Sequence, residues 1–136
     1  MLPFQVAKRV LMILQTEVFQ FEPDITGISC AGRFTMGTRL SETEALIQSM
    51  IEDGLRKLVL DLTHVDIVDS AGLGVIVRVF GELNQRGGRL RISGPSEQAR
   101  RLFEITHTAS FLPVDSELTT SVEKLQQPHE ATGAHA

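Results

Sequence analysis

The sequence predicts a single α/β domain in which helices pack on a mixed β-sheet whose centre is mostly parallel. Short aliphatic runs alternate with amphipathic helical segments along most of the 136 residues, a pattern typical of parallel strands joined by right-handed crossover helices. Two strand-like runs precede the first helical segment, which indicates an antiparallel hairpin at one side of the sheet. A chain of this length is sufficient for one domain with one core.

The folded domain is expected to occupy residues 16–125. Residues 1–15 are interpreted as an N-terminal extension, whose apolar run Val10–Leu14 is too short for a signal peptide or a membrane span. Residues 126–136 contain no large apolar side chain, so we expect a disordered tail there.

The hairpin strands are expected near residues 18–21 and 28–34, on either side of Glu22-Pro23-Asp24, which favours a turn. A helix should then begin at Ser41, because Ser41-Glu42-Thr43-Glu44 has the form of a capping box, with Ser41 as the N-cap and Glu44 at the third helical position. Apolar residues at helical spacing continue this helix: Ile47, Met50, Ile51 and Leu55.

A central strand and a second helix are expected next. Leu58–Leu62 is an apolar run typical of a buried strand, and the helix should begin near Gly72 and end at Gly87-Gly88. Val75 and Val79 lie off the main apolar stripe of this helix, so they either form an exposed apolar patch or pack beneath a neighbouring helix. The stripe itself consists of Leu73, Ile76, Val77, Phe80 and Leu83.

Four shorter elements complete the pattern. A strand is expected at residues 89–93, and Gly94-Pro95-Ser96 should open a third helix. Phe111–Val114 is interpreted as a short edge strand, and Asp115 or Ser116 is expected to cap a last helix. The inward residues of the two helices are Ala99, Leu102, Phe103, Leu118, Val122 and Leu125.

The composition excludes several classes of function. Lys and Arg number 13 against 17 Asp and Glu, a formal charge of −4, and Trp and Tyr are absent, so neither a basic surface nor the usual stacking platforms for direct nucleic-acid binding are expected. The single cysteine, Cys30, indicates a reducing, cytoplasmic setting and is interpreted as a small buried residue. The four histidines show no metal-ligand spacing, so no metal or cofactor is expected.

Charges are unevenly distributed along the chain. Residues 41–70 hold seven acidic residues against two basic ones, whereas residues 78–101 hold six arginines against two glutamates. This pattern indicates either an electrostatic polarity useful for docking a partner or two ordinary solvated faces.

The segment Thr63–Gly74 is interpreted as a loop between the central strand and the second helix, where sites form in parallel sheets. Val68 stands where the Gly-x-Ser-x-Gly motif of hydrolases needs its first glycine, and Gly72 and Gly74 do not continue into a dinucleotide-binding fingerprint. We therefore expect no catalytic residue and no enzyme activity.

Ser70 is the residue of this segment that could carry a modification. At the N-cap of the second helix, a phosphate on its hydroxyl would meet free N–H groups and the positive end of the helix dipole. It would add about −1.5 to −2 charges beside Asp66 and Asp69. The alternatives are that Ser70 is an ordinary helix cap and that Gly72 and Gly74 serve close packing rather than the approach of a partner.

Asp69-Ser70-Ala71-Gly72-Leu73-Gly74, preceded by Leu58–Leu62, resembles the signature of STAS domains of the anti-sigma factor antagonist type. Gly32-Arg33-Phe34-Thr35 falls where that family has a Gly-x-Leu-Asp-like element. Arg101–Thr106 resembles the family's helix after the last central strand. The resemblance covers roughly residues 16–125 and implies a single STAS domain.

The resemblance implies partner switching. The unphosphorylated antagonist binds an anti-sigma factor that is often a serine kinase, and so releases a sigma factor. The kinase phosphorylates the serine after the motif's aspartate, here Ser70, and a metal-dependent phosphoserine phosphatase reverses this step. The protein is expected to be a monomer or weak dimer. The expected partner-binding residues are Asp69, Ser70, Ala71, Gly72, Leu73, Gly74, Val75 and Thr35.

Two positions depart from the family pattern. Thr35 stands where many members have Asp, which would alter partner affinity or choice, and Ala71 stands where a second Ser or Thr is common. STAS domains also act in stress-signalling scaffolds and in lipid or anion transport. The sequence shows neither a sensor domain nor a membrane span, which favours an antagonist, but a STAS subunit of a lipid-transport complex stays an alternative.

Overall fold

The computed structural model describes residues 14–128, and the chain opens with the expected hairpin. Strands β1 (Gln15–Phe21) and β2 (Ile25–Phe34) pair antiparallel, with Phe21 opposite Ile25 across the turn. The prediction of a hairpin around Glu22-Pro23-Asp24 is confirmed.

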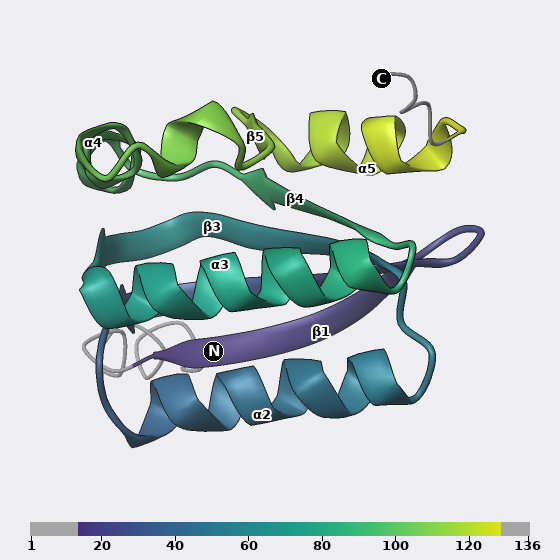
Figure 1. Cartoon of the computed structure of the whole chain (residues 1–136), viewed down its shortest axis with the longest axis horizontal. Helices are drawn as coiled ribbons and strands as arrows, with labels where there is room; N and C mark the ends of the chain where they lie inside the picture. Colours follow the sequence, from purple (N-terminus) through teal and green to yellow (C-terminus); the bar gives the residue numbers. More distant parts are fainter. Residues whose placement is uncertain (1–13, 129–136) are drawn as a thin grey trace, which may run out of the picture.

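The remaining elements alternate between helices and strands (Figure 1). The sheet has the order β1-β2-β3-β4-β5, and every pair except β1–β2 is parallel. The predicted fold class, a mixed sheet with a parallel centre and helices packed on it, is therefore confirmed. The elements after the hairpin are α2 (Thr38–Glu52), β3 (Lys57–Val68), α3 (Ser70–Gln85), β4 (Arg89–Ser93), α4 (Glu97–Ile105), the short helical turn η1 (Thr108–Ser110), β5 (Val114–Asp115) and α5 (Leu118–Gln126).

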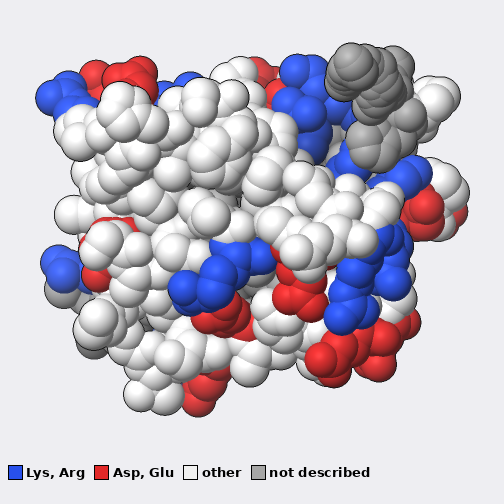
Figure 2. All heavy atoms as spheres, in the orientation of Figure 1, with Lys and Arg blue, Asp and Glu red and all other residues white. Residues whose placement is uncertain are grey.

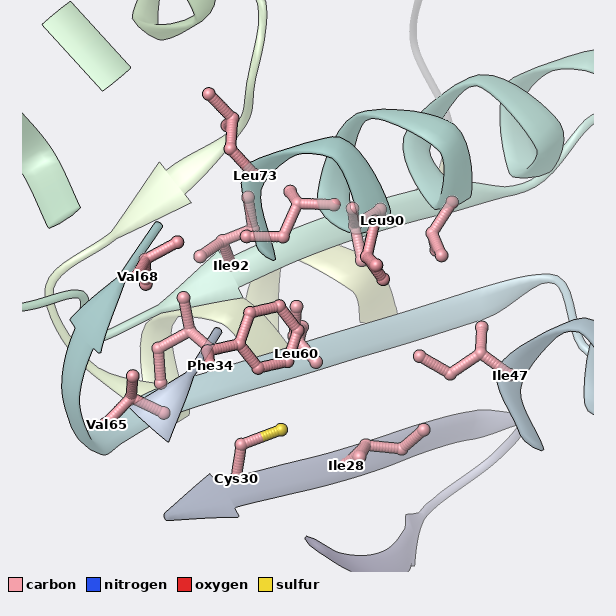
Figure 3. Packing of buried hydrophobic residues seen from close by; sticks show 14 of the residues in the cluster. Ile28, Cys30, Phe34, Ile47, Leu60, Val65, Val68, Leu73, Leu90 and Ile92 are labelled. Atoms are coloured by element: carbon pink, nitrogen blue, oxygen red, sulfur yellow. The ribbon is translucent and has the colours of Figure 1, made fainter. Parts of the chain in front are cut away.

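The main core lies between the sheet and the helices α2 and α3, which run side by side (Figure 1). Strand residues alternate between the two faces of a sheet, so Leu58, Leu60 and Leu62 point into this core. The ring of Phe34, fully buried at the end of β2, lies beside Leu60 (Figure 3). A smaller cluster on the opposite face joins Ile25 and Val59 to α5.

Cys30 is a buried core residue, as predicted, and its thiol is fully shielded from solvent. Burial, together with the negative charge of Asp61, raises the pKa of the Cys30 thiol to about 12. The thiolate that reacts with oxidants is therefore not formed near neutral pH in the folded protein.

The predicted capping box at Ser41 is wrong. Helix α2 begins one turn earlier, at Thr38, and the Ser41 amide donates to the carbonyl oxygen of Gly37 at 3.1 Å. Gly37 is the N-cap, with a φ of 153° that favours glycine, and no side chain caps this end. The pattern misled because Glu44 has a tertiary partner, Arg78 of α3, rather than the start of its own helix.

The prediction of a loop over Thr63–Gly74 is also wrong in its first half. Strand β3 continues to Val68 because β2 extends beside it, with Ala31 opposite His64 and Phe34 opposite Val68. The polar residues within this stretch hid its strand character, although the apolar positions Val65 and Val68 point into the core.

The C-terminal strand and helix cap differ from the prediction as well. The edge strand is Val114–Asp115 rather than Phe111–Val114, because the Phe111 amide closes the preceding turn on the Thr108 carbonyl. Helix α5 has Glu117 as N-cap without a side-chain hydrogen bond, so neither Asp115 nor Ser116 caps it.

Asp115 is instead the centre of a buried ion-pair network. Burial opposes its ionisation, but hydrogen bonds from Arg91, Lys124 and Ser121 outweigh that effect and lower the pKa of Asp115 to about 2. The carboxylate thereby ties β4, β5 and α5 together.

The predicted extension and tail fall mostly outside the described residues, which exclude 1–13 and 129–136. Within the described part, β1 already begins at Gln15 and α5 ends at Gln126. No helix among residues 14–128 combines the length and apolar character needed to cross a membrane. The same residues contain no cluster of His, Cys, Asp and Glu that could hold a metal ion.

Candidate functional site

Ser70 is an exposed residue at the first helical position of α3, where β3 ends. The prediction that Ser70 is the N-cap is wrong, since Asp69 holds that position and its Oδ1 accepts a hydrogen bond from the Gly72 amide at 2.8 Å. Because β3 runs to Val68, the junction is a single residue and the helix starts two residues before the predicted Gly72. The Ser70 hydroxyl is therefore not used for capping.

Asp69 joins two segments that border the site. Its second carboxylate oxygen, Oδ2, accepts a hydrogen bond from the Met36 amide at 3.0 Å. Met36 belongs to the connection between β2 and α2, so one side chain fixes this connection against the start of α3. Both donors are neutral amides, which leaves the charge of Asp69 uncancelled by these contacts.

Gly72 serves close packing. A Cβ at this position would overlap the backbone carbonyl oxygen of Phe34. The first turn of α3 therefore rests directly on the end of β2, and any larger residue would push the helix away. This contact and the Asp69 cap hold Ser70 on a rigid support.

Gln98 is a supporting residue that the sequence did not reveal. Its side-chain Oε1 accepts from the Val68 amide at 2.9 Å and its Nε2 donates to the Val68 carbonyl at 2.8 Å. Strand β4 pairs with β3 only as far as Asp61, so the far end of β3 has no strand neighbour on that side. Gln98 of α4 replaces the missing strand and fixes the residue before Asp69.

A hollow of about 250 Å³ lies between the start of α2 and the start of α3. Of the predicted partner-binding residues, Ser70, Ala71, Gly74 and Val75 line it, whereas Thr35 lines a neighbouring hollow of about 290 Å³. The other residues that line the first hollow are Met36, Gly37, Leu40, Ser41, Glu44 and Arg78.

The expected apolar patch beside Ser70 is not formed by Val75 and Val79. These side chains are only 2% and 1% exposed, because they belong to the core shared by α2, α3 and the sheet. Leu73 is likewise buried. The alternative interpretation, in which a neighbouring helix covers the two valines, is therefore confirmed.

An ion pair crosses the hollow from α3 to α2. Nε of Arg78 donates to Oε2 of Glu44 at 2.8 Å, and Nη2 donates to Oε1 at 3.0 Å. These hydrogen bonds, with the positive charge of Arg78, lower the pKa of the Glu44 carboxyl despite its partial burial. The sequence alone does not pair these two residues, because they are 34 positions apart.

The uneven charge along the chain does not separate into two fields on the face formed by α2 and α3. Figure 2 shows basic and acidic groups side by side over this face. The ion pairs Arg78–Glu44 and Arg86–Glu82 account for part of this mixing. This supports the interpretation of ordinary solvated faces for the side of the molecule in view.

The start of α3 offers donors to an anion. The first amides of a helix have no acceptor within it, and Asp69 uses only that of Gly72. No described hydrogen bond uses the amides of Ser70 and Ala71 among residues 14–128. A phosphate on the Ser70 hydroxyl would lie near these amides and the positive end of the helix dipole.

The chain belongs to the STAS domain family, since a model of that family matches residues 18–124. The Anti-sigma-B factor antagonist of Listeria monocytogenes is 35% identical over 103 residues, which cover 76% of this chain and 90% of the relative. The protein of the same name from Staphylococcus aureus is 38% identical over 74 residues, which cover 54% of this chain and 68% of the relative. The resemblance found in the sequence is thus confirmed.

Solved structures share the fold. An anti-sigma factor antagonist from Mycobacterium paratuberculosis has a TM-score of 0.74 at 18% identity and covers 85% of this chain and 96% of its own. The anti-sigma factor antagonist SpoIIAA in its unphosphorylated form has a TM-score of 0.70 at 16% identity, over 84% of this chain and 100% of its own. At these identities the likeness concerns the fold alone.

Proposed function

We propose that this chain is an anti-sigma factor antagonist controlled by phosphorylation of Ser70. Unphosphorylated, it binds an anti-sigma factor that is also a serine kinase, which frees a sigma factor for transcription. The kinase then phosphorylates Ser70 and the complex dissociates, until a metal-dependent phosphoserine phosphatase removes the phosphate. The chain acts as a cytoplasmic binding protein and not as an enzyme.

The observation that carries this proposal is the exposed hydroxyl of Ser70 on a rigid helix start. It is the only hydroxyl in the hexapeptide Asp69–Gly74. The relative that matches over 90% of its length bears the name anti-sigma-B factor antagonist. We assign the partner surface to Asp69, Ser70, Ala71, Gly74 and Thr35. Gly72, Leu73 and Val75, also predicted to bind the partner, are buried and would support this surface from beneath.

The proposed switch works by charge rather than by refolding. Phosphorylation adds about −1.5 to −2 charges at Ser70, which directly follows Asp69 in the chain. A phosphate is costly to remove from water when a partner covers it. A complex passes from mostly bound to mostly free with a change of about 5.5 kcal/mol, so burial of the phosphate and repulsion must together approach this value.

The test is a pull-down from native cell lysate with the purified chain, in ADP and then in ATP, followed by mapping of phosphate by mass spectrometry. We expect a serine kinase in the ADP sample and phosphate on Ser70 in the ATP sample. Ser70→Ala should bind in both samples. Ser70→Asp adds one charge where a phosphate adds about two, so we expect about half of the 5.5 kcal/mol. At about 1.4 kcal/mol per tenfold, this variant should bind the purified kinase about 100-fold more weakly.

Ser116→Asp is the matched control, because it adds the same charge at another exposed serine, just before α5. It should bind as the unaltered chain does. Equal binding by Ser70→Asp would refute the charge mechanism. Recovery of a transporter ATPase with Ser70 unmodified would instead identify a STAS subunit of a transport complex and reduce Ser70 to the first residue of a helix.

A further inference from the structure

Arg78 lies about two helical turns beyond Ser70 on α3, and both residues line the hollow between α2 and α3. Glu44 accepts hydrogen bonds from Nε and Nη2 of Arg78, and this double contact fixes the plane of the guanidinium. The third nitrogen, Nη1, makes no hydrogen bond recorded for residues 14–128. Arg78 therefore presents a positioned donor that Glu44 does not use.

Gly74 leaves the space in which this nitrogen lies. A Cβ on Gly74 would stand 3.2 Å from Nη1, so the guanidinium sits against the point where a side chain at position 74 would begin. Residues four apart on a helix are neighbours, and Gly74 is four positions after Ser70. The guanidinium of Arg78 thus occupies the space of an absent side chain at position 74, one helical turn from Ser70.

We propose that Arg78 binds the phosphate of phosphorylated Ser70 within the same chain, with Nη1 as the donor and Glu44 as the residue that orients the guanidinium. This inference rests on the proposed phosphorylation of Ser70 and identifies the group that receives the phosphate. A guanidinium suits this role because it stays charged and has five N–H donors, so a phosphate can bind while Glu44 remains in place. The shared hollow of about 250 Å³ is open to the phosphate.

The contact has a consequence for the charge of the switch. The second pKa of a phosphoserine is about 6, and an adjacent cation favours the dianion and lowers that pKa. Arg78 would therefore keep the phosphate doubly charged at lower pH than an isolated phosphoserine. It would also hold the phosphate in the hollow, beside the residues of this chain that we propose contact the partner.

The test uses the full chain with phosphoserine incorporated at position 70 during translation, so that no kinase is needed. A phosphorus NMR titration measures the second pKa of the phosphate. We expect a lower pKa in the otherwise unaltered chain than in its Arg78→Ala variant, with Arg78→Lys between them because Lys keeps the charge but loses the fork. Since the Arg78 side chain is 60% exposed, these variants should fold.

Arg86→Ala is the matched control. Arg86 lies on the same helix, pairs with Glu82 at 3.4 Å and is two turns further from Ser70, so its removal changes the net charge equally at greater distance. A phosphate pKa that responds to Arg78→Ala no more than to Arg86→Ala would overturn the inference. A response specific to Arg78 supports it even if no kinase phosphorylates Ser70, which separates this result from the fate of the proposed function.

Discussion

Two aspartates at strand-to-helix junctions place the same carboxylate in contrasting surroundings. Asp115, at the end of β5, has a side chain only 1% exposed and pairs with Arg91 at 2.6 Å and Lys124 at 2.9 Å. Asp69, directly after β3, is half-buried and accepts hydrogen bonds from the backbone amides of Met36 and Gly72. One charge is balanced by two cations, and the other is held by neutral groups.

This difference separates a structural junction from the junction that we propose binds a partner. The Asp115 network is directed inward and fastens α5 to the sheet, with no part of the carboxylate left for a partner. Asp69 fixes the geometry around Ser70 through bonds from two neutral backbone amides, which do not cancel its charge. The same residue type thus gives stability at one junction and a rigid, charged surface at the other.

The largest effect expected at the junction around Asp69 comes from Gly72→Ala. The added methyl group would overlap the Phe34 carbonyl oxygen, which backbone atoms cannot avoid without moving α3. We expect a loss of about 3 kcal/mol in the free energy of unfolding, at the upper end for overpacking, measured by urea denaturation. Gly81→Ala, in the same helix with no atom within 4 Å of its Cβ, is the control. It should raise stability by up to about 1 kcal/mol. Equal effects would mean that α3 does not rest on β2.

The second prediction concerns the structural junction and its pH dependence. The pKa of Asp115 is about 2 when folded, against an ordinary value of 3.8, so its stabilisation is complete above about pH 4 and is lost as the pH falls through 2. At about 1.4 kcal/mol per pKa unit, Asp115→Asn should cost roughly 2 kcal/mol at pH 7. Urea denaturation from pH 7 to pH 2 should show the two proteins converging in acid. A difference that stayed constant with pH would contradict the ion-pair account.

The smallest expected effect is that of Asp69→Ala. Loss of the helix cap and of the link to Met36 should lower the free energy of unfolding by about 1–2 kcal/mol, as for other N-caps. Ser41→Ala is the control, because Ser41 lies inside α2 and caps nothing. It should change stability by less than about 0.5 kcal/mol. A larger loss of stability from Ser41→Ala than from Asp69→Ala would mean that Ser41 caps α2 after all and would contradict the N-caps seen in the structure.

Much of the fold could be predicted because it depends on local patterns. The alternation of apolar runs and helical stripes identified the element order, and Gly94-Pro95-Ser96 correctly marked the start of α4, where Ser96 caps the helix. The errors lie where a tertiary contact outweighs a local signal. The polar end of β3 is a strand because β2 lies beside it, and Glu44 leaves its expected capping role because Arg78 lies across the hollow.

For the candidate site, the sequence by itself determined which residues stand together at the hexapeptide Asp69–Gly74, since they are adjacent in the chain and follow a buried strand. Only the tertiary structure decided that Asp69 rather than Ser70 caps α3, because that choice depends on how far β2 supports β3. It also decided the contact of Gln98 with Val68, 30 positions apart in the chain, and the contact of Arg78 with Glu44, 34 positions apart. Such pairings depend on how separate elements pack against one another, and the local spacing of residues in the sequence does not specify that packing.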